Sequence, residues 1–229
     1  ARARPERRRP LAVFVLAPYR HSGLHQSPVS CAPMEVVLVH PEIPHNTGCA
    51  ARLAAATGVR LHLVEPLGFQ LEDRYLKRAG LDYWPMVDLV VHADLEAARA
   101  HLAAGSERPL AERLRPFSAR GGRSLFEASF EPDDLLLFGS ESKGLPPELL
   151  AEAGDRRVYV PILPGVRSLN LANAVALGLY TAMDRAGVPL PAGDGTYAPH
   201  PEASADLFAA DVAKPGAGAA AATDPGATP

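Results

Sequence analysis

Three short segments combine residue types that packing alone does not explain, and the first of them precedes a predicted helix. Residues 40–48 read His-Pro-Glu-Ile-Pro-His-Asn-Thr-Gly, the first motif. Asn46 or Thr47 can cap the helix, whose free N–H groups would then bind an anion. Arg52 stands about one and a half turns into this helix, near enough to meet a phosphate or a hydroxyl. An ordinary capped helix with a solvated arginine accounts for these residues equally well.

The second motif follows an apolar run that predicts a strand. Residues 138–146 read Phe-Gly-Ser-Glu-Ser-Lys-Gly-Leu-Pro. Gly139 and Gly144 allow the backbone to approach a ligand, and Glu141 places a carboxylate at the strand end. The spacing matches neither the phosphate-loop nor the dinucleotide fingerprint. Taken alone, the segment is as typical of a plain turn as of a binding loop.

The third motif leads into the longest predicted helix, residues 169–186. Residues 160–173 read Val-Pro-Ile-Leu-Pro-Gly-Val-Arg-Ser-Leu-Asn-Leu-Ala-Asn. Helix capping explains Ser168 but not both Asn170 and Asn173, so at least one asparagine is expected to face a ligand. The helix body is rich in alanine, with Gly178 near its middle, and is apolar on nearly every face. It is suited either to burial within the monomer or to a subunit interface.

Overall charge excludes a global electrostatic attraction to nucleic acid. The 229 residues hold 23 Lys and Arg against 26 Asp and Glu, for a net charge of −3. Any RNA site must therefore be a local basic patch. The densest basic patch in the central part of the chain is Arg74, Lys77 and Arg78. The alternative interpretation of this patch is an ordinary solvated surface with no ligand.

Cysteine and histidine usage predicts neither a disulfide framework nor a metal site. Only two cysteines are present, which indicates a reducing compartment, and we expect a cytoplasmic protein. Cys49 is interpreted as a packed thiol. Four histidines at predicted loop and strand positions lack a partner at ligand spacing: His40, His45, His62 and His92. No apolar run approaches the roughly 18 residues of a membrane span.

Apolar runs and helical patterns alternate through the central part of the chain. Strands are predicted at residues 34–40, 60–64, 87–92, 134–138 and 157–160. Helices are predicted at residues 47–57, 94–104 and 169–186, the first closed by Gly58 and the second capped by Asp94. This alternation predicts an α/β fold with a mostly parallel sheet and helices on both faces, with ligands at the carboxyl ends of the strands.

The two ends of the chain differ from the centre in composition. Residues 1–33 carry six arginines and one acid without periodicity, and residues 188–229 are dominated by Ala, Pro and Gly. We expect both segments to be disordered, with Met34 as the biological start and residues 34–187 as the folded domain.

In this order, the three motifs resemble those of the SPOUT ribose methyltransferases. Residues 65–69 (Glu-Pro-Leu-Gly-Phe) and 77–83 (Lys-Arg-Ala-Gly-Leu-Asp-Tyr) are similar to one subfamily, the tRNA (cytidine/uridine) 2′-O-methyltransferases, which act on the wobble ribose. The resemblance covers residues 34–187. It implies a C-terminal trefoil knot, an exception to the rule that chains are unknotted.

The resemblance also implies a cofactor, S-adenosylmethionine, bound bent in the knot, and no metal. The residues it assigns to this cofactor are Phe117, Gly139, Gly144, Val160, Ile162, Ser168 and Leu169. Phe117 comes from aligning residues 115–120 with a strand that precedes the second motif. The backbone of the loops is expected to supply most of the contacts.

For the reaction, the resemblance assigns activation of the ribose hydroxyl to Arg52. A guanidinium is a very weak acid and has no acceptor while charged, so two roles stay open for Arg52, a base or a fixed cation. The residues expected to orient Arg52, ribose and cofactor are Asn46, Glu141, Ser168 and Asn170.

The expected partners are the tRNA anticodon stem-loop and a second copy of the chain. Arg74, Lys77 and Arg78 are expected to contact RNA, and the helix at residues 169–186 is expected to form a homodimer interface. The alternatives are a ribose methyltransferase acting on another tRNA position or on rRNA, and a nonenzymatic RNA-binding protein. An oxidoreductase is disfavoured because its glycine fingerprint is absent.

Overall fold

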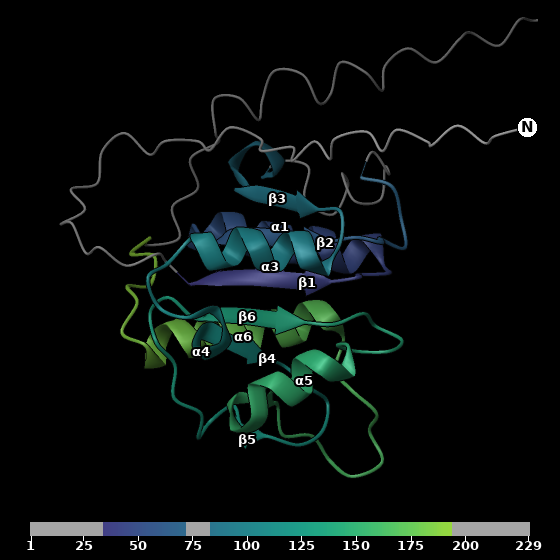
Figure 1. Ribbon diagram of the computed structural model, residues 1–229, viewed down its shortest axis with the longest axis vertical. Coiled ribbons are helices and arrows are strands. Elements are labelled where there is room, and N and C mark those ends of the chain that lie inside the picture. Colours follow the sequence, from purple (N-terminus) through teal and green to yellow (C-terminus); the bar gives the residue numbers. More distant parts are fainter. Residues whose placement is uncertain (1–33, 72–82, 194–229) are drawn as a thin grey trace, which may run out of the picture.

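The computed structural model describes residues 34–71 and 83–193, and its centre is a five-stranded parallel sheet (Figure 1). The strand order is β3-β2-β1-β6-β4. The strands are β1 (Glu35–Val39), β2 (Arg60–Val64), β3 (Leu89–His92), β4 (Leu114–Pro116) and β6 (Leu135–Phe138). Val36 is paired with Leu61 on one side and with Leu136 on the other. The loops after β1 and β6 are therefore neighbours, although about a hundred residues separate them in sequence.

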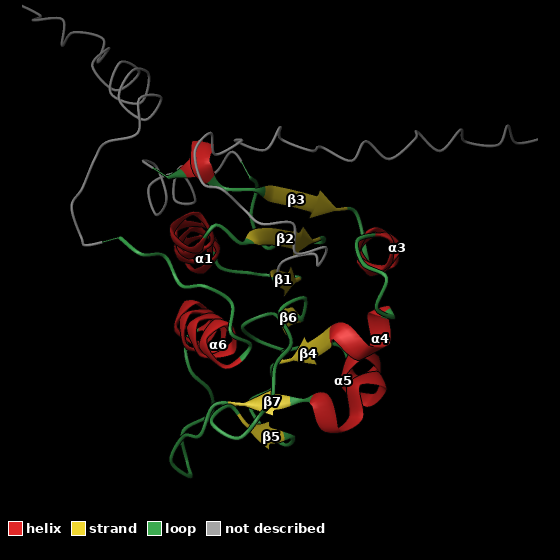
Figure 2. Ribbon diagram, turned by 90° about the vertical axis from the view of Figure 1, so that its left-hand side faces the viewer, coloured by secondary structure: helices red, strands yellow, loops and turns green. Residues whose placement is uncertain are grey.

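Helices cover both faces of this sheet, as predicted (Figure 2). Helices α1 (Pro44–Thr57) and α6 (Leu171–Arg185) lie side by side on one face. Helices α3 (Leu95–Ala104), α4 (Leu110–Arg113) and α5 (Pro147–Ala153) lie on the other. Two 3₁₀ turns, η1 (Trp84–Met86) and η2 (Gly154–Arg156), complete the described helices. The α/β class with a parallel sheet is thus confirmed.

Most residues of the strands are apolar because both faces of the sheet are buried. Side chains alternate between the faces, so Leu61 and Leu63 pack towards α1 and α6. Val37 and Val39 pack in the second core, towards α3 and α5. This two-sided burial accounts for the continuous hydrophobic runs in the sequence.

Two strands differ from the prediction. The segment predicted as a strand at residues 157–160 forms only β7 (Val158–Tyr159), which pairs with β5 (Arg123–Ser124) outside the main sheet. The fifth strand of the main sheet is instead β4, which contains Arg115 and Pro116 and so lacks an apolar run. The buried carboxylate of Asp134 pairs with the Arg115 guanidinium at 2.8 Å and allows this cation to enter the sheet.

The helix ends confirm some predicted caps and correct others. Asp94 caps α3 by accepting from the Ala97 N–H, and Gly58 ends α1 in the left-handed region with φ 72°. Helix α1, however, begins at Pro44 rather than at residue 47 and has no side-chain cap. Proline suits the first helical position because the N–H it lacks would have had no partner there.

The two terminal segments that the sequence predicts to be disordered lie almost entirely outside the described residues. Residues 1–33 and 194–229 lie outside the described residues, as do Arg74, Lys77 and Arg78. Val188, placed in the tail by composition, packs against the main core, and its N–H donates to the Met183 carbonyl. Within the described ranges, every helix is too short or too polar to cross a bilayer.

Candidate active site

A cavity of about 550 Å³ opens at the carboxyl ends of β4 and β6, where the second and third motifs meet. The residues predicted to bind cofactor all lie on its wall: Phe117, Gly139, Gly144, Val160, Ile162, Ser168 and Leu169. Asn46, Glu141 and Asn170 lie on the same wall. Parallel strands bring their carboxyl ends to one edge, and this places residues from distant parts of the chain around one space.

Glu141 joins the second motif to the first through its carboxylate. Its Oε2 accepts from the Glu42 N–H at 2.8 Å, and its Oε1 accepts from the Ile43 N–H at 3.3 Å and from Asn46 Nδ2 at 2.8 Å. The anion that sits at the start of α1 is therefore the chain's own carboxylate. This corrects the expectation that the helix start is free for a phosphate.

A second carboxylate returns the interaction in the opposite direction. The Ser142 N–H donates to Glu42 Oε2 at 3.0 Å, and the Ser142 hydroxyl donates to Glu42 Oε1 at 2.6 Å. Each motif thus supplies one carboxylate to the backbone of the other. Sequence reasoning did not single out Glu42 or Ser142, although both stand inside the quoted motifs.

Asn46 and Asn170 extend the connection to the third motif. The Asn170 Nδ2 donates to Asn46 Oδ1 at 2.8 Å, and the Asn46 side chain is buried. Asn170 Oδ1 also accepts from the Ala172 N–H at 2.9 Å and from the Asn173 N–H at 3.4 Å. Asn170 is therefore the N-cap of α6, which corrects the assignment of that cap to Ser168. Ser168 is exposed at the cavity instead.

The glycines of the second motif allow a tight turn. A Cβ added at Gly139 would lie 2.0 Å from the Gly144 carbonyl carbon, and Gly144 has φ +73°. Two hydrogen bonds close the turn, from the Ser140 N–H to the Gly144 carbonyl at 3.2 Å and from the Gly144 N–H to the Ser140 carbonyl at 2.8 Å. A side chain at Gly139 would clash with this backbone, and one at Gly144 would be strained by the positive φ, which explains both residue types.

Aromatic packing forms one wall of the cavity. The Phe117 and Phe138 rings stack with centroids 4.4 Å apart. A Cβ at Gly178 of α6 would lie 2.8 Å from the Phe117 ring, so glycine at this point lets the helix approach the ring closely. The placement of Phe117 at the cavity agrees with the alignment of residues 115–120.

Arg52 does not line the cavity. It is exposed on α1, more than two turns from the helix start because α1 begins earlier than predicted. Its guanidinium carbon lies 4.8 Å from the centroid of the Tyr83 ring, within cation–π range. Tyr83 was not predicted as a site residue, although it ends the quoted segment at residues 77–83.

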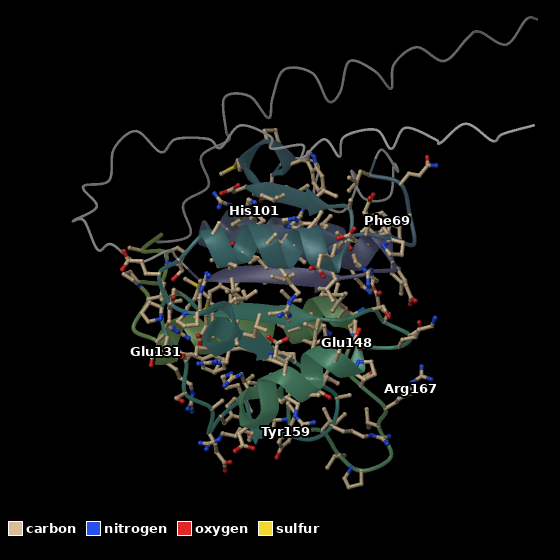
Figure 3. All side chains as sticks on the ribbon, in the orientation of Figure 1. Phe69, His101, Glu131, Glu148, Tyr159 and Arg167 are labelled. Atoms are coloured by element: carbon tan, nitrogen blue, oxygen red, sulfur yellow. The ribbon has the colours of Figure 1, made fainter. Side chains whose placement is uncertain are left out.

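A separate polar cluster lies beneath α3, and none of its residues lines the cavity. Buried His62 is within hydrogen-bond distance of the His92 ring, at 2.9 Å, and contacts the Glu35 carboxylate. His101 of α3 packs its ring against both other histidines, with centroids 5.7 and 5.2 Å away. Figure 3 labels His101 of this cluster and Arg167 of the third motif in separate parts of the molecule.

The pKa values in this cluster follow from burial and mutual charge. Burial, and then the neighbouring His62 and His101, lower the pKa of His92 to about 4. Burial alone would raise the pKa of Glu35, but the hydrogen bond and charge of His62 bring it below its usual value. Burial likewise lowers the pKa of His101.

Comparison with known proteins agrees with the arrangement of the motifs. Residues 33–180 match the profile of the SpoU rRNA Methylase family. The chain is 47% identical over 153 residues to a tRNA (cytidine(34)-2′-O)-methyltransferase of Burkholderia pseudomallei (strain 1106a), covering 66% of this chain and 95% of that protein.

Solved structures extend the likeness to the fold. One, described as giving structural insights into the 2-OH methylation of C/U34 on tRNA, is 49% identical with a TM-score of 0.60, covering 66% of this chain and 95% of that chain. An AdoMet-bound rRNA methyltransferase from Sinorhizobium meliloti is 26% identical with a TM-score of 0.58, covering 66% of this chain and 56% of that chain.

Proposed function

We propose that this chain, which belongs to the SpoU rRNA Methylase family, transfers a methyl group from S-adenosylmethionine to the ribose 2′-oxygen of the wobble nucleotide of tRNA, cytidine or uridine 34. The observation that carries the proposal is the likeness to the Burkholderia enzyme over nearly its whole length. The hydrogen-bond network that joins all three motifs at one cavity supports it.

The cavity suits a ligand of the cofactor's size and chemistry. Its volume of about 550 Å³ is within the usual range for small-molecule sites. Phe117, Phe138 and Leu169 offer apolar walls, while the hydroxyl of Ser168 and the backbone of the motif loops offer polar contacts. We also propose that the C-terminal part of the fold forms a trefoil knot, and that the loops of the second and third motifs belong to it.

Bound S-adenosylmethionine would supply a methyl group on a positively charged sulfur. The ribose 2′-oxygen would form the new bond to this carbon as the carbon–sulfur bond broke and its electron pair went to sulfur. The 2′-hydroxyl proton would pass to solvent water, because none of the assigned residues acts as a base. A hydroxyl is a weak nucleophile, so positioning it and stabilising the developing alkoxide supply most of the acceleration.

The Glu141–Asn46–Asn170 network positions the reacting groups. It holds the start of α1 and the start of α6 beside the cavity. The links are the Asn46 and Asn170 side-chain amides and the Glu141 carboxylate, which accepts three hydrogen bonds. Ser168 is exposed beside this network and is assigned to contact substrate or cofactor directly. These residues hold the starts of the two helices in place.

We assign Arg52 the role of a fixed cation that stabilises the alkoxide and contacts an adjacent phosphate. A guanidinium stays protonated at neutral pH and has no acceptor while charged, which disfavours the alternative role as a base. The Tyr83 ring holds this guanidinium on the surface of α1, where RNA can reach it.

The proposal includes a homodimer through α6. Leu177 and Tyr180, one turn apart on α6, are about 40% exposed, and together they form an apolar patch on the outer side of this helix. Helix α1, which carries Arg52, lies beside α6 on the same face (Figure 2). An interface through α6 would also bring the second subunit close to α1, the helix that carries Arg52.

The test is to identify the methylated nucleotide. Purified protein is incubated with tRNA transcripts and labelled S-adenosylmethionine, and the RNA is digested and mapped. Label on the ribose of nucleotide 34 is the expected result. Label on another tRNA nucleotide or on rRNA would indicate a ribose methyltransferase with a different substrate. RNA binding without methyl transfer would refute enzymatic activity.

A further inference from the structure

Three basic side chains surround the cavity and have no part in the network that positions the reaction. Arg120 comes from the loop between β4 and β5, Lys143 from the second motif and Arg167 from the third. All three line the cavity and all three are exposed. In a chain with a net charge of −3, this is a local concentration of positive charge.

Hydrogen bonds hold the backbone beneath two of these cations. The Arg120 N–H donates to the Ser118 hydroxyl oxygen at 3.2 Å, and that hydroxyl donates to the Arg120 carbonyl at 2.8 Å. The Lys143 N–H donates to the Ser140 hydroxyl oxygen at 3.2 Å. The base of each side chain is thus fixed while its charged end reaches solvent. The Arg167 side chain extends away from the ribbon at the carboxyl-end edge (Figure 3).

No acid of the described ranges neutralises these charges. None of the three cations forms an ion pair within residues 34–71 and 83–193. The carboxylate on the cavity wall, Glu141, instead accepts from backbone N–H groups and from Asn46. The interior is apolar at Phe117 and Phe138, so the cavity combines an apolar interior with a basic rim.

We propose that Arg120, Lys143 and Arg167 form a phosphate clamp, which binds the RNA backbone on either side of the methylated nucleotide. The inference rests on the proposed function for the identity of the RNA. Phosphate contacts set the register and orientation of a nucleic acid, which a reaction at one ribose needs. A cofactor carboxylate is a single anion, whereas three cations on three separate loops match a chain of phosphates.

The test compares charge-removing variants in a salt titration. Arg120→Gln, Lys143→Gln, Arg167→Gln and the triple variant are titrated with an anticodon stem-loop RNA carrying cytidine at the wobble position, over a range of NaCl concentrations. A single-stranded phosphate contact contributes about 0.7 to the slope of log affinity against log salt. We expect each variant to lower the slope by about this amount and to lose roughly fivefold in affinity at 0.1 M salt, and the triple variant about a hundredfold.

Arg123→Gln is the matched control. Arg123 is exposed on β5 and does not line the cavity, so its removal changes the net charge equally and should leave the slope unchanged. The free energy of unfolding of each variant is measured as well, to show that any loss of RNA affinity does not come from a loss of folded protein. Because the replaced side chains are exposed, we expect little change in stability. If the Arg123 variant loses as much RNA affinity as the other three, the effect is one of net charge and the clamp is refuted.

The cofactor provides the competing explanation. We expect the triple variant to bind S-adenosylmethionine as tightly as the original protein in calorimetric titration. Loss of cofactor affinity with an unchanged salt slope would assign these cations to the cofactor carboxylate and overturn the proposal. If the slopes fall as expected but methylation maps to a nucleotide other than 34, the clamp stands and the proposed function fails.

Discussion

Two polar networks lie in different parts of the same parallel sheet, and they differ in what they leave accessible. At the carboxyl ends, Glu141, Asn46 and Asn170 connect three loops around an open cavity. Beneath α3, Glu35, His62 and His92 are buried and contact one another. The first network holds loops in place for a ligand, whereas the second fills an interior.

The two networks also differ in how pH acts on them. The cavity network uses amides, which do not titrate, and a carboxylate that accepts three hydrogen bonds. In the histidine cluster beneath α3, made of Glu35, His62, His92 and His101, the pKa values of Glu35, His92 and His101 are lowered. Changes to the first should therefore alter chemistry, and changes to the second should alter stability.

The largest effect on chemistry is expected from Arg52→Ala. Removal of one stabilising donor costs about 10²–10³ in rate, so methyl transfer should fall by this factor or more. Because Arg52 does not line the cavity, the affinity for S-adenosylmethionine should stay the same. Transfer rates on tRNA and calorimetric titration with the cofactor check the two halves. Arg52→Lys, which keeps the charge, should retain more activity than Arg52→Ala.

The histidine cluster should make stability fall in acid. The pKa of His92 is about 4 in the folded protein against an ordinary value of 6.5, so the unfolded chain binds its proton first as pH falls. The free energy of unfolding should therefore decrease between pH 6.5 and 4, by on the order of 3 kcal/mol in all. Glu35, whose pKa is also lowered, adds to the loss below its usual value of 4.5.

Urea unfolding at a series of pH values measures this dependence. In His92→Leu, which cannot titrate, the slope between pH 6.5 and 4 should become shallower. If the free energy of unfolding of this variant depends on pH as steeply as that of the original protein, His92 does not cause the loss of stability in acid.

The smallest effect is expected at Tyr83. An exposed cation–π contact contributes about 0.5–1 kcal/mol, so Tyr83→Leu should lower kcat roughly two- to fivefold by releasing the Arg52 guanidinium. Tyr83→Phe keeps the ring and should keep the rate. Steady-state kinetics on tRNA separate the two variants. Equal losses in both would assign the effect to the phenol hydroxyl rather than to the ring.

The parallel sheet and the convergence of the motifs could be predicted from the sequence, because both follow from local patterns. Apolar runs predict β1, β2 and β6, and parallel strands must bring the loops after β1 and β6 to one edge. Glycine at residues 139 and 144 similarly indicates the tight turn that the structure contains.

Features that depend on distant partners could not be predicted. The strand β4 contains Arg115, which enters the sheet only because Asp134 is buried beside it. The start of α1 moves to Pro44, and the position of Arg52 beside Tyr83 depends on a segment some thirty residues away. The histidine cluster combines side chains from four elements, and no spacing in the sequence brings them together.

The comparison of the two networks is tested most directly by paired variants, Asn170→Ala at the cavity and His62→Ala in the histidine cluster. For each purified variant, the free energy of unfolding and the kcat of the folded protein on tRNA are measured together. We expect Asn170→Ala to lose most of its kcat and about 1 kcal/mol of stability, the usual contribution of a helix cap. We expect His62→Ala to lose about 3 kcal/mol or more, since buried partners lose their hydrogen bonds, and to keep its kcat. A folded His62→Ala variant with reduced kcat, beside an Asn170→Ala variant with normal kcat, would contradict the division between the two networks.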